Sequence, residues 1–208
     1  AAPSNVDLMV RVAGFQVGEQ PEEAVRTQRR AAELDPRSVQ TWVALGNTLL
    51  TLRRYAEAAD AIGRGRTIDP ASFRLLQLEL MTHLAQGDLA GGRRVLAGVS
   101  RDVDQAALVA YLATYNDLYW VLSDAQQTLL LNLPPSAFDN DRATWGTVMM
   151  QTYYVRGDRA RASAYADSAR PAYEAQLRDA PDDPQLHALY GLALAYLGRK
   201  EDAIREGR

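Results

Sequence analysis

The stretch WVALGNTLLTLRRYAEAADAIGRGRTIDP, residues 42–70, decides the fold of this chain. Apolar residues recur in it at the spacing of a helix face, first around Trp42 and Leu45 and again, after a polar break, around Ile62. Pro70 ends the second run, because proline lacks an amide donor and disfavours helix at the residue before it. The stretch therefore predicts two antiparallel helices joined by a short turn.

The same features recur along the chain at a fixed spacing. Ala24, Ala58 and Gly92 lie 34 residues apart, and so do Pro36 and Pro70. A fixed period of this length is the signature of a repeat protein, in which each short helix pair stacks on the next. We therefore predict a helical solenoid, which presents an extended surface rather than an enclosed pocket.

This pattern resembles the tetratricopeptide repeat, which spreads an aromatic residue, a Leu-Gly pair, an alanine and a proline over about 34 positions. The matching residues are Trp42, Leu45, Gly46, Ala58 and Pro70, and in a second copy Tyr190, Gly191, Leu194, Ala203 and Ile204. The resemblance implies an all-α, right-handed α-α superhelix of five to six helix pairs. We predict a single domain, residues 1–208, with approximate units 5–38, 39–72, 73–106, 107–140, 141–183 and a truncated 184–208.

The repeat pattern weakens after Pro70. Ser123 and Gln126 stand at the two positions of a capping box, which predicts a helix start in the fourth unit. Gly157 and Gly198 lie 41 residues apart instead of 34, so the helix after Gly157 should be longer than usual. Pro171 falls within it and should kink or break it near residues 167–170.

Composition excludes several classes of function. The 208 residues are 47% apolar with a formal charge of -3, which argues against the basic stripe that nucleic-acid binding requires. No run of 18 apolar residues is present, so no membrane contact is expected, and a cytoplasmic location is favoured. The basic residues are almost all arginine, a usage typical of GC-rich bacterial genomes. The chain begins without Met and stops in a predicted helix, so we expect it to be a segment of a longer polypeptide.

Catalysis finds little support in the sequence. The only histidines are His83 and His187, and both fall at positions that the repeat register assigns to helix packing. There is no cysteine, no nucleophile elbow, no phosphate loop and no metal-ligand spacing. We therefore predict no enzyme activity, no metal and no cofactor.

Binding residues follow from the resemblance. It implies that the first helix of each pair lines a concave groove, through side chains on the face away from its partner helix. Mapped onto this chain, the groove residues are Gln40, Asn47, Arg74, Gln77, Tyr111, Tyr115, Tyr119, Gln151, Tyr154 and Tyr196.

The stripe of Tyr111, Tyr115 and Tyr119 allows two interpretations. At spacings of four residues these rings lie on one helix face, where they would suit a peptide-binding surface. An aromatic stripe at helical spacing is also typical of core packing, and the register of this unit could be rotated by one position. Exposure of the rings distinguishes the two.

The predicted function is a non-catalytic protein-interaction module that binds a peptide segment or protein domain, with no nucleic-acid or membrane partner. The last repeat resembles those of large bacterial signalling proteins, which implies a docking or sensor arm. A chaperone-tail clamp is not expected, because Asn47 matches the clamp's asparagine but Val43 and Met9 stand where charge would be needed. The alternative is a structural element that mediates self-association.

Overall fold

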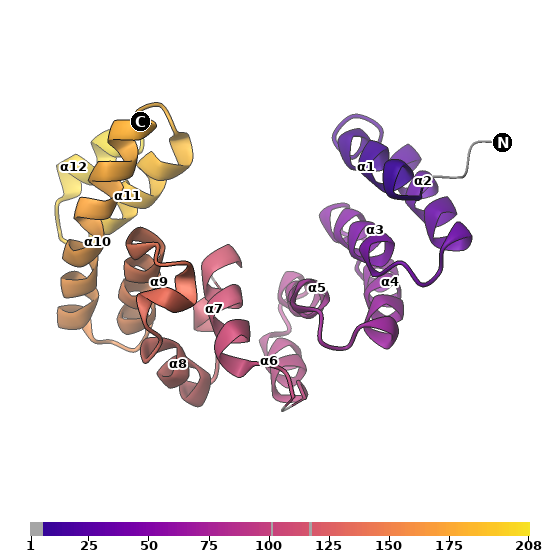
Figure 1. Cartoon of the computed structure of the whole chain (residues 1–208), viewed down its shortest axis with the longest axis horizontal. Coiled ribbons are helices and arrows are strands. Elements are labelled where there is room, and N and C mark those ends of the chain that lie inside the picture. Colours follow the sequence, from indigo (N-terminus) through magenta and orange to yellow (C-terminus); the bar gives the residue numbers. More distant parts are fainter. Residues whose placement is uncertain (1–5, 101, 117) are drawn as a thin grey trace. The chain divides into compact units, whose positions relative to one another are not determined.

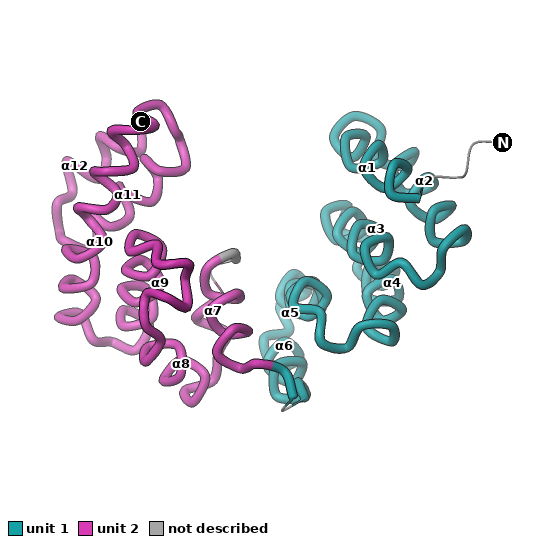
Figure 2. Tube along the Cα trace, in the orientation of Figure 1, with its two compact units in different colours: residues 1–103 teal, residues 104–208 magenta. Residues whose placement is uncertain are grey.

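The computed structural model describes residues 6–100, 102–116 and 118–208. The chain forms two compact units, residues 1–103 and 104–208 (Figure 2). Within the described residues the secondary structure consists of twelve α-helices and two short 3₁₀ helices. The prediction of an all-α fold is confirmed. None of the helices in this part of the chain is long and apolar enough to cross a bilayer.

Unit 1 is a stack of antiparallel helix pairs (Figure 1). Its helices are α1 (Val6–Gln16), α2 (Pro21–Leu34), α3 (Val39–Thr51), α4 (Tyr55–Ile68), α5 (Phe73–Ala85) and α6 (Leu89–Ala97). Helix α3 packs against its partner α4 and also against α1 and α5. The first helices of the pairs, α1, α3 and α5, therefore form one layer. We call the surface of this layer the first-helix face of unit 1.

Side-chain caps start the helices of unit 1 where the sequence offers them. The hydroxyl of Ser38 accepts from the amide of Thr41 and begins α3. Ser72 does the same for α5, and the carboxylate of Asp88 accepts from the amide of Gly91 to begin α6. Each cap satisfies an amide that the first helical turn leaves without a partner.

Close helix contact holds the central pair together. A Cβ placed on Gly46 would lie 2.8 Å from Cγ1 of Ile62, so glycine allows α3 and α4 to approach. Trp42 lies at the end of this seam, where its indole nitrogen donates to the carbonyl oxygen of Pro36 at 2.9 Å. The surrounding core buries Leu45 and Leu49 to 4% and 1% exposure. The spacing that predicts two helices thus also positions the residues that fill the seam.

Unit 2 has a less regular first half. Its elements are α7 (Gln105–Asn116), η1 (Leu118–Trp120), α8 (Asp124–Leu131), η2 (Pro135–Phe138), α9 (Arg142–Val155), α10 (Arg159–Asp179), α11 (Pro184–Tyr196) and α12 (Lys200–Glu206). Ser123 and Gln126 form the predicted capping box at the start of α8. Asp183 caps α11, with Pro184 at its first position as the sequence indicates.

Helix α10 runs for 21 residues and continues through Pro171, so the break near residues 167–170 does not occur. Pro171 is exposed, whereas Ala166, Ala169 and Tyr173 on the opposite side are buried against neighbouring helices. The packing of α10 residues before and after Pro171 outweighs the hydrogen bond that the proline nitrogen cannot donate. The prediction that this helix is unusually long is correct.

The core of unit 2 depends on an equally close approach. A Cβ on Gly146 would lie 2.7 Å from Cβ of Ala169, so α9 and α10 nearly touch there. One turn away the hydroxyls of Thr147 and Tyr173 share a buried hydrogen bond of 2.6 Å. Apolar side chains of α11 complete this core.

Candidate partner-binding surfaces

On the first-helix face of unit 1, three predicted site residues from two helices meet. The Arg74 guanidinium donates to Oδ1 of Asn47 at 3.3 Å and to Oε1 of Gln77 at 2.9 Å. Gln77 in turn donates to the sulfur of Met81 at 3.4 Å. Asn47 comes from α3 and the others from α5, so the row bridges two successive pairs.

The members of this row differ in exposure. Arg74 and Asn47 are exposed, as is Gln40 at the start of α3. Gln77 is only 1% exposed and so orients Arg74 rather than offering surface itself. Among the described residues no carboxylate forms an ion pair with Arg74. Its charge is therefore held by neutral oxygens and stays available to an anionic group.

The three tyrosines of the predicted stripe do not share one helix, because Tyr111 and Tyr115 belong to α7 whereas Tyr119 lies in η1. Tyr111 and Tyr119 have intermediate exposure, while the side chain of Tyr115 lies outside the described residues. The carbonyl oxygen of Tyr119 accepts a hydrogen bond from the side-chain Nε2 of Gln127 at 3.1 Å, which fixes the backbone after α7. Binding and core packing both remain predictions for these rings.

Two other predicted residues of unit 2 meet at the ends of their helices. The rings of Tyr154 and Tyr196 lie edge to face with centroids 4.9 Å apart, and Tyr154 is 41% exposed. Cζ of Arg159 lies 3.6 Å from the centroid of Tyr154, a cation–π contact. Gln151, by contrast, is 5% exposed and lies within the core of the unit.

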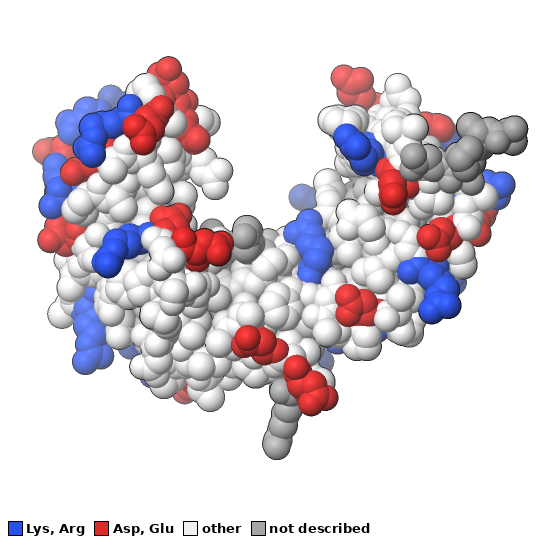
Figure 3. All heavy atoms as spheres, in the orientation of Figure 1, with Lys and Arg blue, Asp and Glu red and all other residues white. Residues whose placement is uncertain are grey.

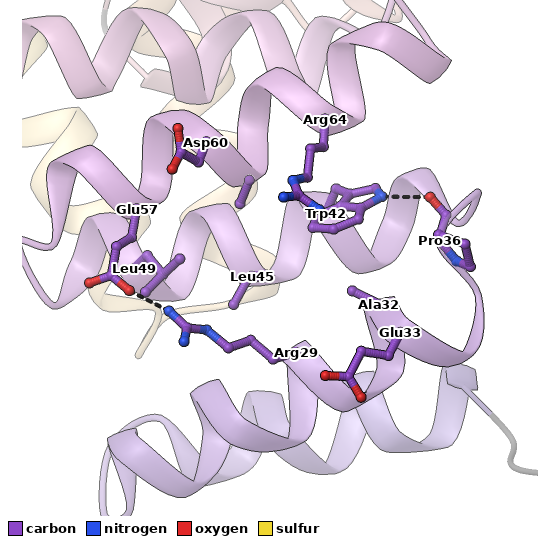
Figure 4. A pocket seen from close by; sticks show the side chains of 11 residues that line it. Arg29, Ala32, Glu33, Pro36, Trp42, Leu45, Leu49, Glu57, Asp60 and Arg64 are labelled. Carbon is purple, nitrogen blue, oxygen red and sulfur yellow. Dashed lines mark hydrogen bonds and ion pairs between the residues drawn. The ribbon is translucent and has the colours of Figure 1, made fainter.

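A cleft of about 540 Å³ opens on the other side of unit 1, between α2 and α4 (Figure 4). Its floor comes from α3 and is apolar, with Trp42, Leu45 and Leu49. Charged residues of both signs surround the floor: Arg29, Glu33, Glu57, Asp60 and Arg64. We call this the second-helix cleft.

Most of the charges at this cleft are already paired. Arg29 forms an ion pair with Glu57 across the cleft (Figure 4), and Nε of Arg54 lies 2.7 Å from the same carboxylate. The hydrogen bond from Arg54 lowers the pKa of Glu57 below its usual value. Arg30 pairs with Glu33 at 2.8 Å. Of these contacts, the Arg29–Glu57 ion pair ties α2 to α4.

Asp60 and Arg64 differ from the other charged residues of the cleft in their pairing. Neither forms an ion pair with any described residue, although they stand four apart on α4. Cζ of Arg64 instead lies 5.4 Å from the centroid of the Trp42 ring. Sequence reasoning missed this cleft because it placed the binding residues on the first helices of the pairs. The sequence feature that could have indicated the cleft is the pair of opposite charges at positions 60 and 64, next to the small residue Ala61.

The two histidines make polar contacts rather than apolar packing. Nδ1 of His83 lies 3.0 Å from Asp88, whose pKa is lowered chiefly by the backbone amide of Gly91. His187 contacts Glu206 through Nδ1 at 2.7 Å and the carbonyl oxygen of Pro181 through Nε2 at 2.8 Å. Both partners of His187 accept hydrogen bonds, which raises its pKa. No group of three potential metal ligands occurs in the described ranges.

Charge is mixed on the visible surface. Figure 3 shows basic and acidic side chains interspersed over the face in view, in line with the formal charge of -3. Electrostatic binding to nucleic acid needs a patch of one sign, which this face does not present.

Solved structures of other proteins share the fold of this chain. No protein-family model matches the sequence, and no curated protein matches it. The solved structure of PilW, a widely conserved type IV pilus biogenesis factor, is similar with a TM-score of 0.58 at 13% identity, over 99% of this chain and 91% of that one. A tetratricopeptide repeat protein from Parabacteroides merdae gives 0.58 at 16% identity, over 99% and 77%.

A chain of the APC/C hetero-tetramer Cut9-Hcn1 gives a TM-score of 0.56 at 13% identity, over 99% of this chain and 39% of that one. At such low identities these likenesses establish the fold alone. The chain is an all-α superhelix of tetratricopeptide-like helix pairs.

Proposed function

We propose that this chain is a protein-protein interaction module, and that the first-helix face of unit 1 binds a peptide segment of its partner. The row formed by Asn47, Arg74 and Gln77 carries the proposal, because it bridges two pairs and presents a guanidinium without a counter-ion. The fold supports it, since stacked helix pairs offer an extended surface.

The geometry favours an acidic group in the bound segment. Two neutral oxygens hold Arg74 in place, so its orientation is fixed before a partner arrives and less side-chain entropy is lost on binding. A guanidinium presents several N–H donors in a plane that matches a carboxylate. Gln77 lies beneath it as a buried support.

The test is selection of short random peptides on the wild-type protein, followed by fluorescence anisotropy with the selected sequences. We expect acidic residues to be enriched and Arg74→Gln to weaken binding by roughly tenfold, because a charge-assisted hydrogen bond is lost. Arg37→Gln, another exposed arginine of unit 1, is the matched control. Equal affinity of Arg74→Gln and wild type for every selected peptide would contradict the proposal.

Self-association is the second candidate function, and one observation favours it. Helix α1 buries Val10 and Ala13, yet its opposite side exposes an apolar stripe in which Val12 is 44% and Phe15 85% exposed. A helix that is apolar on both faces is typical of one covered on both. Light scattering over a range of concentrations tests this: wild type should exceed the monomer mass and Phe15→Glu should not. The role as an arm of a signalling protein stays a prediction.

A further inference from the structure

The second-helix cleft is a separate surface from the row at Arg74. It lies between α2 and α4, and its floor is the side of α3 that carries Trp42 and Leu49 (Figure 4). We propose that this cleft is a second docking site, which takes a linear segment of a partner protein with one apolar side chain flanked by a basic and an acidic residue.

Size and lining support an inserted apolar side chain. The volume of about 540 Å³ lies within the range of roughly 300–1,000 Å³ that ligand-binding clefts show. Trp42, Leu45 and Leu49 line the bottom, and Ala32 and Ala61 stand on the two walls. An aromatic or aliphatic side chain placed there contacts apolar groups on three sides.

The charges around the cleft specify what flanks that side chain. Arg29 and Glu57 neutralise one another, and Glu33 is paired with Arg30. What remains is one carboxylate, Asp60, and one guanidinium, Arg64 (Figure 4). A complementary segment therefore brings one cation and one anion, which distinguishes it from an acidic peptide, a nucleic acid or an anionic lipid.

The arrangement of this pair is unusual for a helix. Opposite charges four residues apart normally attract one another across a turn. Arg64 instead lies over the Trp42 ring, with its Cζ 5.4 Å from the centroid. Asp60 is thereby left without a cation among the described residues, so both groups can contact a partner without first breaking an ion pair.

Trp42 is a reporter for the experiment. In two-dimensional NMR of isotope-labelled protein, its indole N–H signal is identified as the one missing from Trp42→Phe. The probes are three capped peptides, acetyl-Gly-Lys-Phe-Glu-Gly-amide and its Gln-Phe-Gln and Lys-Ala-Glu counterparts. We expect a saturable shift of this signal with the first, about fivefold weaker binding of the second because two ion pairs are lost, and no saturable shift with the third.

Protein variants complete the test. Asp60→Asn/Arg64→Gln should bind the Lys-Phe-Glu and Gln-Phe-Gln peptides equally, while the control Arg37→Gln/Asp139→Asn keeps the preference. The proposal is overturned if none of the peptides shifts the Trp42 signal saturably, or if Gln-Phe-Gln binds wild type as tightly as Lys-Phe-Glu.

Discussion

Replacing Gly146 by alanine should measurably destabilise unit 2. A Cβ at this position would lie 2.7 Å from Cβ of Ala169 and 3.3 Å from the carbonyl oxygen of Tyr165. Carbon atoms prefer a separation of about 3.5–4.0 Å, so α9 and α10 must move apart by about 1 Å. Neither neighbour can swing aside, because one is a methyl group fixed to the backbone and the other is the backbone itself.

The magnitude follows from two opposing effects. Because neither neighbour can move aside, overpacking should cost about 2–3 kcal/mol, the upper part of its usual range, and the better helix propensity of alanine offsets about 1 kcal/mol of that. We therefore expect the free energy of unfolding to fall by about 1–2 kcal/mol, with a melting temperature roughly 2–8 °C lower. Urea and thermal unfolding, followed by far-UV circular dichroism, measure both quantities.

Gly63→Ala is the matched control. Gly63 lies in α4, is exposed, and has no atom within 4 Å of the position that a Cβ would take. The same substitution should raise stability there by about 0.5–1 kcal/mol, because alanine restricts the unfolded chain without a clash. A Gly146→Ala protein as stable as wild type would show that α9 and α10 are not in close contact at this point.

Three further predictions concern single polar contacts. Tyr173→Phe should lower the free energy of unfolding by about 1–2 kcal/mol, because it leaves the Thr147 hydroxyl buried without its partner. Ser123→Ala should cost about 1 kcal/mol through loss of the capping box of α8, measured by urea unfolding. The pKa of His187 is raised in the folded state. Its contribution to the free energy of unfolding is therefore complete below the unfolded pKa near 6.5 and is lost as the pH rises through the folded pKa. Thermal unfolding at several pH values should show this decline in wild type and not in His187→Gln.

Each of these has a control within the chain. Tyr154→Phe removes an exposed hydroxyl and should leave stability unchanged. Ser168→Ala changes an exposed serine inside α10 and should not destabilise. His83→Gln should lose stability with rising pH as wild type does, because His187 is still present. A pH profile of His187→Gln identical to that of wild type would disprove the assigned role of its two hydrogen bonds.

The fold could be predicted because its determinants are local and repeated. The spacing around Trp42, Gly46 and Ile62 is dictated by one helix packing on its neighbour, and that requirement recurs with every pair. Of the kink or break expected near Pro171, the break does not occur, and the reason is tertiary. Buried contacts on the far side of α10 stabilise the helix more than a single missing hydrogen bond destabilises it.

The candidate surfaces were predictable only in part. Register along a helix gives the side on which a residue lies, so Asn47 and Arg74 could be assigned to one face from sequence. Register does not give depth: Gln77 and Gln151 also lie in first helices of their pairs, yet both are buried. The second-helix cleft depends on how far α2 and α4 stand apart, a distance that no single-helix pattern encodes.

The length of α10 has a consequence for cooperativity. Its first half packs on α9 near Gly146, while Glu174 in its second half accepts a hydrogen bond at 3.0 Å from the hydroxyl of Tyr190 in α11. In most repeat arrays each pair can open at its own free energy, apart from the interface with its neighbour. Here the uninterrupted helix α10 contacts both α9 and α11, so the last four helices, α9 to α12, should exchange their amide hydrogens as a single block.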